Sequence, residues 1–172
     1  SQEAAEKHRR EDRWDVAEDA GRGWRRVVAS PVPRKIMELD TIRGLTEAVT
    51  VVVAAGGGGI PVVEDESGQL IGAAAVIDKD LASSLLARKI GADTLIISTA
   101  VEKVFLDFGK PNQRAVDRMT IAEAKRYMAE GHFKAGSMLP KVRAVVEFLE
   151  AGGTEAIITN PENLEAAVAG RA

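Results

Sequence analysis

The chain has 172 residues, of which 45% are hydrophobic and 28% are charged, and these are ordinary values for a globular protein with one packed core. Its formal net charge of −3 argues against a nucleic-acid-binding surface, which is normally basic. It contains no cysteine, so the sequence predicts neither disulfides nor thiolate chemistry. The longest apolar stretch, residues 49–55, is far too short to cross a bilayer, and no signal peptide is recognisable. We therefore expect a cytoplasmic protein with no nucleic-acid partner and no membrane partner.

The first part of the chain alternates charged segments with segments that interrupt secondary structure. Residues 1–20 are strongly charged and predict an exposed helix, and residues 24–28 predict a strand. Residues 30–33 interrupt this pattern, because proline restricts both its own backbone and that of the preceding residue. Asp40 is expected to cap the next helix. The apolar residues of that helix lie near one face at Ile42, Leu45 and Val49.

A run of glycines follows the most apolar segment of the chain. Residues 49–54 are expected to form a buried parallel strand, which leads into Gly56, Gly57, Gly58 and Gly59. Glycine loses more backbone freedom on folding than any other residue, so four in succession indicate a close ligand or positive φ angles. A strand that ends in such a loop is a common phosphate site. The alternative is a flexible surface loop, although the proline-stiffened exit at Ile60–Val62 favours a fixed one.

The middle of the chain predicts a strand, a helix and a second strand. Gly68 marks a turn, and residues 70–77 form the next expected strand. Asp78 and Asp80 are expected to open a helix, because acidic residues suit the positive end of the helix dipole. Residues 94–98 then predict another strand.

The last third of the chain continues the alternation of helices and strands. Residues 120–123 form a capping box at the start of a helix that Gly131 ends, and Pro140 is expected at the first position of the next helix. Residues 154–159 predict a strand and residues 161–169 a final helix. This order implies an α/β sandwich with a mainly parallel sheet.

Three charged residues at predicted helix starts are the candidate chemical groups. Lys79 follows a strand and begins a helix, so its ammonium group and the helix N-terminus can face one phosphate. Asp80 is placed to orient Lys79 or a second lysine, and Lys141 follows Pro140 at another helix start. Phosphoryl transfer needs such positioned positive charge more than covalent chemistry. The alternative is that both lysines are solvated and that Asp78 and Asp80 only cap the helix.

Several motifs in a fixed order extend this hypothesis over nearly the whole chain. They are Gly21–Val28, Ser30–Pro31, Gly56–Val62, Val76–Asp80, Phe108–Gln113, Gly131–Met138 and Pro140–Val142. Together these motifs closely resemble those of the carbamate kinases, a branch of the amino-acid kinase family. The resemblance implies an amino-acid kinase-like αβα sandwich that transfers phosphate between carbamoyl phosphate and ADP, giving ATP and carbamate. It also implies Mg²⁺ that arrives with the nucleotide, and a homodimer.

The same resemblance implies roles for individual residues. Lys79, Asp80 and Lys141 match the family's two phosphate-binding lysines and the aspartate that organises them. Residues matching the family's nucleotide-binding loops, besides the four glycines, are Thr99, Val104, Phe105, Lys110, Pro111, Ser137 and Met138. Among these, Val104, Phe105, Lys110 and Pro111 are expected to border adenine. The alternative for that region is a hairpin that buries Phe105 and Phe108 in the core.

Carbamate kinases are about twice this long, and the chain resembles only their C-terminal part. The family's N-terminal Gly-Gly-Asn loop and a further phosphate-binding lysine have no counterpart here, and the sequence begins at Ser1. We therefore expect residues 1–46 to link to the absent half and residues 47–172 to form the nucleotide-binding domain, inactive as an isolated fragment. The chain also departs from the usual family residues near the expected site, at Ala29, Ala74, Ala100 and Leu139.

Two alternatives to carbamate kinase activity remain. One is a non-catalytic nucleotide-binding or assembly domain, and the other is a kinase of the same fold that forms the acyl phosphate of another small acid. The fold alone does not separate them. His132 is a weak candidate for acid–base catalysis, and a structural role is favoured. The two histidines lack metal-ligand spacing, so no protein metal site is expected.

Overall fold

The computed structural model describes residues 1–19, 21 and 23–170. The chain divides into two compact units, which are considered separately. The first unit comprises Ser1–Pro31 and Ile60–Ile77, and the second comprises Val32–Gly59 and Asp78–Ala172. Arg22, in the first of the family-like motifs, lies outside the described residues. The expected division at residue 46 concerns a missing half and stays a prediction.

In the first unit, a charged helix precedes a short antiparallel pair. Helix α1 (Gln2–Glu11) starts at Ser1, whose hydroxyl accepts a hydrogen bond from the amide of Ala4 at 3.3 Å. Strands β1 (Asp15–Glu18) and β2 (Trp24–Val27) then pair antiparallel. The predicted strand at residues 24–28 is therefore present, whereas the helix predicted over residues 1–20 ends at Glu11 and is followed by β1.

The same unit contains a hairpin of β3 (Val62–Glu64) and β4 (Leu70–Gly72). Its turn includes Gly68, at φ +82°, as the sequence predicts. The expected strand at residues 70–77 is too long, because regular pairing ends at Gly72 opposite Val62. Pro61 precedes Val62 and has no amide proton with which to extend the ladder. Beyond this point the amide of Ala73 still donates to the carbonyl oxygen of Pro61 at 3.0 Å, and an isolated parallel bridge joins Ala29 to Ala75.

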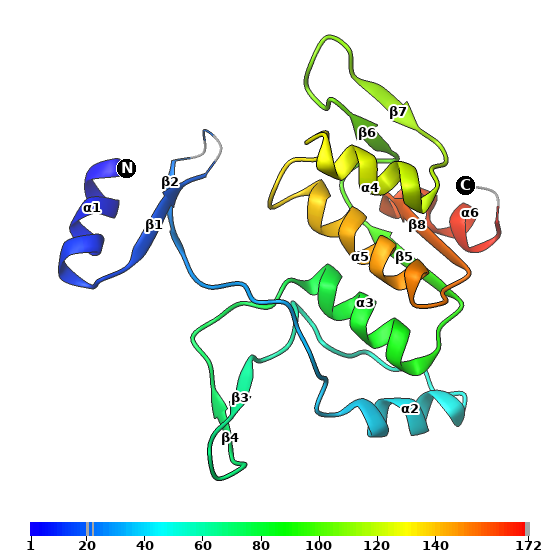
Figure 1. Cartoon of the computed structure of the whole chain (residues 1–172), viewed down its shortest axis with the longest axis horizontal. Coiled ribbons are helices and arrows are strands. Elements are labelled where there is room, and N and C mark those ends of the chain that lie inside the picture. Colours follow the sequence, from blue (N-terminus) through cyan, green and yellow to red (C-terminus); the bar gives the residue numbers. More distant parts are fainter. Residues whose placement is uncertain (20, 22, 171–172) are drawn as a thin grey trace. The chain divides into compact units, whose positions relative to one another are not determined.

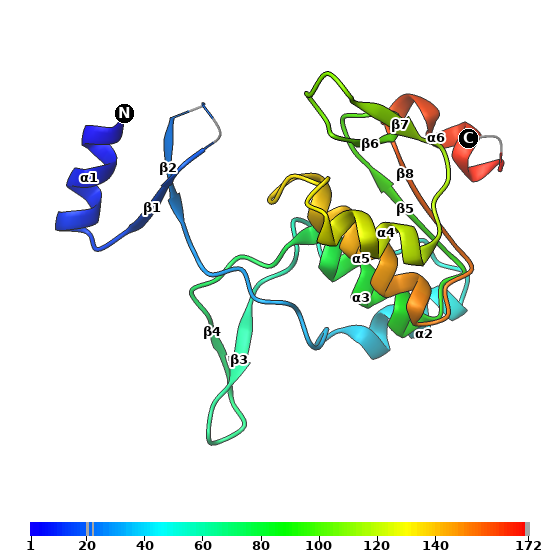
Figure 2. The same cartoon turned by 45° about the horizontal axis from the view of Figure 1, so that its top comes forward.

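The second unit has a parallel strand pair covered by two long helices. Strands β5 (Thr94–Ser98) and β8 (Glu155–Thr159) lie side by side, with helices α3 (Lys79–Ile90) and α5 (Met138–Glu150) packed against them (Figure 1 and Figure 2). Both strands agree with their predicted positions. The buried side chains of this core are Leu81, Ala87, Leu95, Ile97, Ala144 and Phe148. The mixed α/β fold and its parallel pair confirm the expected fold class.

Inside this core, α3 and α5 approach each other closely. The hydroxyl of Ser84 donates a fully buried hydrogen bond of 2.7 Å to the carbonyl oxygen of Ala144. Small residues at both positions allow this contact. The contact fixes α3 against α5, and so fixes the starts of the two helices relative to each other.

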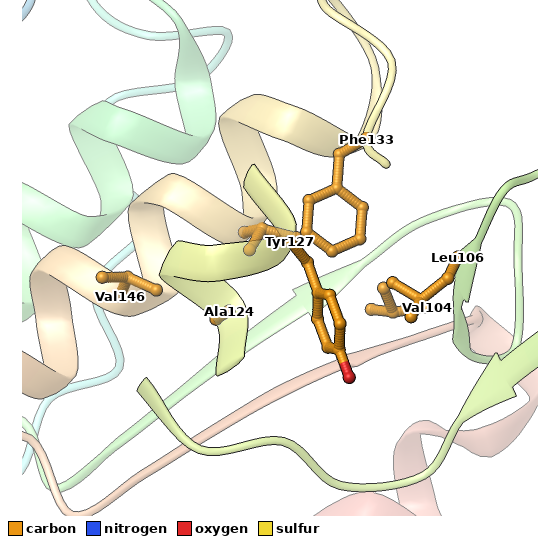
Figure 3. Close-up of a cluster of buried hydrophobic side chains, with 7 residues drawn as sticks. Val104, Leu106, Ala124, Tyr127, Phe133 and Val146 are labelled. Carbon is orange, nitrogen blue, oxygen red and sulfur yellow. The ribbon is translucent and has the colours of Figure 1, made fainter. Parts of the chain in front are cut away.

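A second hydrophobic cluster lies beside the first (Figure 3). It joins the antiparallel hairpin β6 (Val104–Leu106) and β7 (Arg114–Val116) to helix α4 (Ile121–Ala129) and to α5. Its buried members are Val104, Leu106, Ala124, Tyr127, Phe133, Val142 and Val146. Helix α4 begins with the predicted capping box, in which Thr120 and Glu123 bond reciprocally, and Gly131 follows its C-cap at φ +76°.

The remaining helices show where two capping predictions are wrong. Helix α2 (Leu39–Glu47) begins after Glu38, so Asp40 lies in the first turn, where it pairs with Arg43 at 3.1 Å. Pro140 is the third residue of α5, because the helix already begins at Met138. Proline is tolerated throughout the first turn, where amides lack an intrahelical acceptor. The chain ends with the 3₁₀ turn η1 (Pro161–Asn163) and helix α6 (Leu164–Val168).

The expected buried strand at residues 49–54 is absent. These residues form no strand, and the side chains of Val51 and Val53 are 94% and 98% exposed. Within the described chain, the amides of residues 51–54 donate no backbone hydrogen bond. A strand needs a neighbouring strand to bond its backbone, and no described strand lies beside this segment.

Among the described residues, no helix is long and apolar enough to span a membrane.

Candidate functional site

The three charged residues predicted from the sequence come together in the second unit. Oδ1 of Asp80 accepts a hydrogen bond from Nζ of Lys79, and Oδ2 accepts one from Nζ of Lys141, each at 2.8 Å. Asp80 is buried, at 6% exposure, whereas the side chains of Lys79 and Lys141 are 53% and 13% exposed. One buried carboxylate thus bridges two ammonium groups, each in the first turn of a different helix.

Local folding explains why Asp80 is available for this role. The N-cap of α3 is Asp78, whose Oδ1 accepts from the amides of Asp80 and Leu81 at 2.8 and 3.1 Å. The predicted capping function therefore belongs to Asp78 alone. Asp80 is free to turn toward α5, which the Ser84 hydrogen bond holds alongside α3. The bridge between the lysines is a consequence of this helix pairing.

Electrostatics stabilise the charged forms of this group. Burial acts to raise the pKa of Asp80, but the hydrogen bonds and charges of Lys141 and Lys79 outweigh it and hold that pKa below the ordinary 3.8. Burial acts to lower the pKa of Lys79, yet Asp80 holds it above the ordinary 10.5. Asp80 and Lys79 are consequently both ionised at neutral pH.

This arrangement suits a polyphosphate. Two ammonium groups contact one carboxylate near the N-terminal ends of α3 and α5, the positive ends of the two helix dipoles. A phosphate group has the charge and the acceptor oxygens to bind to both lysines. Within the described ranges, no group of three His, Cys, Asp or Glu side chains is arranged to hold a metal ion. The two lysines therefore fit an anion.

The glycine run has the backbone predicted for it, in an open setting. Gly58 and Gly59 have φ angles of +132° and +88°, conformations that side chains rarely adopt. A Cβ atom added at Gly56, Gly57 or Gly59 would meet nothing within 4 Å. Within the described part of the chain, no hydrogen bond joins these glycines to Lys79 or Lys141, so their part in phosphate binding stays a prediction.

The residues expected around adenine occupy three different settings. Val104 is a core residue of the second cluster, whereas Phe105 is half-buried and Lys110 and Pro111 are exposed in the β6–β7 loop. The amide of Thr99, just beyond β5, donates to the carbonyl oxygen of Thr159 at 2.8 Å. The assignment of these residues to adenine is not tested by the geometry.

The hairpin alternative is correct for the backbone and wrong for Phe108. The pair β6–β7 is a hairpin, but Phe108 is 64% exposed. Alternation along β6 directs Val104 and Leu106 into the core, and Phe108 lies beyond the strand in the loop. Phe105 and Phe108 instead approach each other on the hairpin, with ring centroids 5.9 Å apart.

The start of α5 holds the remaining predicted residues. Ser137 is the exposed N-cap, and its hydroxyl donates to the carbonyl oxygen of Lys134 at 3.3 Å. Met138 and Leu139 both pack against the second hydrophobic cluster. The bulky Leu139 therefore has a place in the core. The exposed Ala100 offers no carboxylate at the end of β5.

The sequence interpretation missed a polar cluster around Asp107. This residue, at φ +52°, accepts hydrogen bonds of 2.7 Å from Nζ of Lys110 and from Nδ2 of Asn112. Nδ1 of His132 lies 3.4 Å from Oδ1 of Asp107, and Nε2 of His132 lies 3.2 Å from Oε2 of Glu130. The only sequence signal for this cluster is an aspartate two residues before Gly109, a pattern typical of turns.

Comparisons with known proteins place the sequence in a family. Residues 11–160 match the amino acid kinase family. The carbamate kinase-like protein YahI of Escherichia coli (strain K12) is 56% identical over 91% of this chain and 50% of YahI. The carbamate kinase of Thermococcus kodakarensis is 47% identical over 99% of this chain and 54% of that protein. The chain thus spans about half the length of the curated relatives that it matches.

Solved structures extend this likeness to the fold. The carbamate kinase from Giardia lamblia bound to AMP-PNP has a TM-score of 0.85 and 40% identity, covering 99% of this chain and 54% of that one. The Giardia lamblia enzyme bound to citric acid has a TM-score of 0.88 at the same identity, covering 99% and 53%. The family match spans most of the sequence, and the structural match spans nearly all of it. The chain therefore belongs to the amino acid kinase family.

Proposed function

We propose that this chain is the nucleotide-phosphate-binding part of a carbamate kinase, which transfers phosphate between carbamoyl phosphate and ADP to give ATP and carbamate. The observation that carries the proposal is the buried Asp80, bridging Lys79 and Lys141 at 2.8 Å each. The identity of 40–56% to carbamate kinases and a carbamate kinase-like protein supports it, as does a related Giardia lamblia structure bound to AMP-PNP.

In this proposal the two lysines have different tasks. The more exposed Lys79 approaches the phosphate that moves, and neutralises negative charge that grows during transfer. The less exposed Lys141 binds a phosphate that stays on the nucleotide, because Asp80 and the turn of α5 restrict its movement. Asp80 holds both ammonium groups in place, so little reorganisation is needed during the reaction. Mg²⁺ enters bound to the nucleotide phosphates.

Titration of the chain with AMP-PNP, followed by calorimetry and amide NMR, tests the proposal. We expect the largest shifts at the starts of α3 and α5, and we expect Lys141→Met to weaken binding by about tenfold or more. Lys125→Met is a matched control, because Lys125 pairs with Glu150 on the exposed surface. Equal binding by the Lys141→Met variant, or shifts confined to other elements, would contradict the assignment.

A second candidate function, assembly, is favoured by a different observation. Val49, Val51, Val53 and Ile60 are each at least 90% exposed, and exposed apolar segments of this kind mark interfaces. We propose a homodimer as part of the complete protein, acting in the cytoplasm, where ADP and ATP are present. Light scattering at micromolar concentration is expected to give a mass above that of one chain, and a monomeric mass would count against assembly.

A further inference from the structure

His132 lies between two carboxylates from different segments. Its Nδ1 faces Asp107 in the β6–β7 loop at 3.4 Å, and its Nε2 faces Glu130 at the C-cap of α4 at 3.2 Å. Nδ1 is buried and forms no hydrogen bond with any described residue. A neutral imidazole carries one ring proton, so one nitrogen would present a lone pair to a carboxylate. Only the imidazolium form offers a proton to both carboxylates.

Asp107 connects this histidine to the whole β6–β7 loop. Its two carboxylate oxygens accept from Lys110 and Asn112, and the amide of Gly109 donates to Oε1 of Gln113 at 2.8 Å. The hydrogen bond from Lys110 lowers the pKa of Asp107 below its ordinary value, against the effect of burial, and the charge of His132 acts in the same direction. A change at Asp107 would therefore alter the conformation of residues 107–113.

The other charged groups near the ring are already paired. Lys110 forms an ion pair with Asp107, and Nε of Arg126 lies 3.9 Å from Oε1 of Glu130. The edge of the His132 ring meets the ring of Tyr127, with centroids 5.4 Å apart, and the guanidinium groups of Arg114 and Arg126 lie over Tyr127. Both carboxylates thus face the imidazole directly, while Lys110, Arg114 and Arg126 each pair with a carboxylate or with the tyrosine ring.

The backbone fixes His132 on the core side of this contact. Its amide donates to the carbonyl oxygen of Tyr127 at 3.1 Å, and the neighbouring Phe133 is buried in the second cluster. The same connection continues to Ser137 and the start of α5, where Lys141 lies. His132 therefore joins the β6–β7 loop to the connection that leads to the candidate phosphate site.

We propose that His132 is a positioning residue whose imidazolium form ties the β6–β7 loop to the α4–α5 connection. Loss of its proton loosens residues 107–113. If the proposed function is correct, on which this further step rests, nucleotide affinity falls as His132 deprotonates, because Lys110 and Pro111 lie on that loop. Histidine is the side chain that ordinarily changes charge between pH 5 and 8, so the experiment must include that range.

The experiment follows the loop and the ring separately in the ¹⁵N-labelled chain between pH 5 and 9. We expect the amides of residues 108–110, 112 and 113 to shift with the same midpoint as the His132 ring nitrogens. Their hydrogen-exchange protection, corrected for intrinsic rates, should fall about three- to tenfold across that midpoint. His132→Gln should remove this dependence. His8→Gln is the matched control, because His8, the other histidine, pairs with Asp12 on α1 and should leave the dependence unchanged.

A second variant keeps the test valid if His132→Gln fails to fold. Glu130 is half-exposed, and Glu130→Gln removes one facing carboxylate while His132 remains, so the midpoint should move to lower pH. The proposal would be overturned if the loop amides did not change as His132 titrates. It would also be overturned if they showed the same pH dependence in the His132→Gln variant.

The link to nucleotide has its own readout. AMP-PNP affinity is measured for the parent chain and for the His132→Gln variant at each pH. The ratio of the two affinities is independent of the titration of the nucleotide phosphates, which affects both proteins equally. This ratio should fall as the pH rises through the midpoint of the His132 titration. A constant ratio would overturn the positioning role, even with a responsive loop. Absence of AMP-PNP binding at every pH would contradict the proposed function. The hydrogen-exchange data would still show whether protonated His132 holds the β6–β7 loop.

Discussion

At the scale of single residues, Asp80 determines the character of the candidate site. It could be predicted from sequence, because it stands beside Lys79 at a helix start. Its link to Lys141, 61 residues away, required the packing of α3 on α5. The Asp107–His132 contact could not be predicted, because neither residue has a periodic or capping signature that points to the other. Local patterns indicate which residues are polar, whereas tertiary packing decides which of them meet.

The two lysines should differ in their effects on stability. Lys141→Met leaves the buried Asp80 with one partner, so we expect a loss of about 1–2 kcal/mol in the free energy of unfolding. Lys79→Met removes a half-exposed partner and should cost less than about 1 kcal/mol. Urea unfolding of both variants measures the difference. Equal losses would indicate that burial does not distinguish the two ion pairs.

The lowered pKa of Asp80 predicts a specific acid response. A carboxyl group whose pKa is depressed by folding contributes stability at pH above its unfolded value, and this contribution disappears as pH falls through the folded value. Because the ordinary value is 3.8 and the folded pKa lies below it, the loss should occur below about pH 4. Asp80→Asn should flatten this part of the stability profile, as measured by denaturation between pH 2 and 6. Parallel profiles for the two proteins would show that the ion pairs do not stabilise the fold.

At the scale of elements, the predictions succeeded where the necessary information was local. The strands β5 and β8 and the capping box of α4 each carry their own pattern and formed as predicted. The segment at residues 49–54 has the pattern of a buried strand, but its burial depends on a neighbouring strand that the described chain does not place there. Composition signals that a segment tends to be buried, and the rest of the fold decides whether it is.

A glycine in the turn between α5 and β8 tests the packing of the first core. An added Cβ at Gly153 would lie 2.3 Å from a ring carbon of Phe148, which is almost fully buried. Gly153→Ala should therefore lower the free energy of unfolding by about 1–3 kcal/mol through overpacking.

Gly44, within α2, provides a control of opposite sign. It has open space around it, so Gly44→Ala should raise stability by about 0.5–1 kcal/mol through helix propensity. Denaturant midpoints of the two variants, measured with the parent chain, give both values. Destabilisation by Gly44→Ala equal to that by Gly153→Ala would refute the packing argument.

At the scale of the whole molecule, the chain spans about half the length of the carbamate kinases and carbamate kinase-like proteins that it matches. The described residues place two lysines on one carboxylate. In-line transfer of phosphate, however, needs the donor and the acceptor held on opposite sides of the moving group, with charge neutralised around it. The lysine pair and the neighbouring helix ends supply only part of this arrangement.

We therefore predict that the 172-residue chain binds nucleotide but does not transfer phosphate at a useful rate. A coupled assay of ATP formation from carbamoyl phosphate and ADP measures this directly. The carbamate kinase of Thermococcus kodakarensis, assayed at the same concentration, serves as the positive control. Turnover comparable to that control would mean that the chain contains a complete catalytic site.

The exposed valines of residues 49–54 have a further consequence for the behaviour of the chain in solution. Residues 49–54 form a six-residue stretch without charge or proline, rich in β-branched side chains, and the amides of residues 51–54 donate no backbone hydrogen bond within the described chain. Such a stretch has the signature of cross-β segments that stack into amyloid fibrils. Concentrated samples should slowly gain thioflavin T fluorescence, and Val51→Lys should suppress it, because like charges would then stack along each fibril. The segment that most resembles a core strand is thus also the main fibril hazard of the isolated chain.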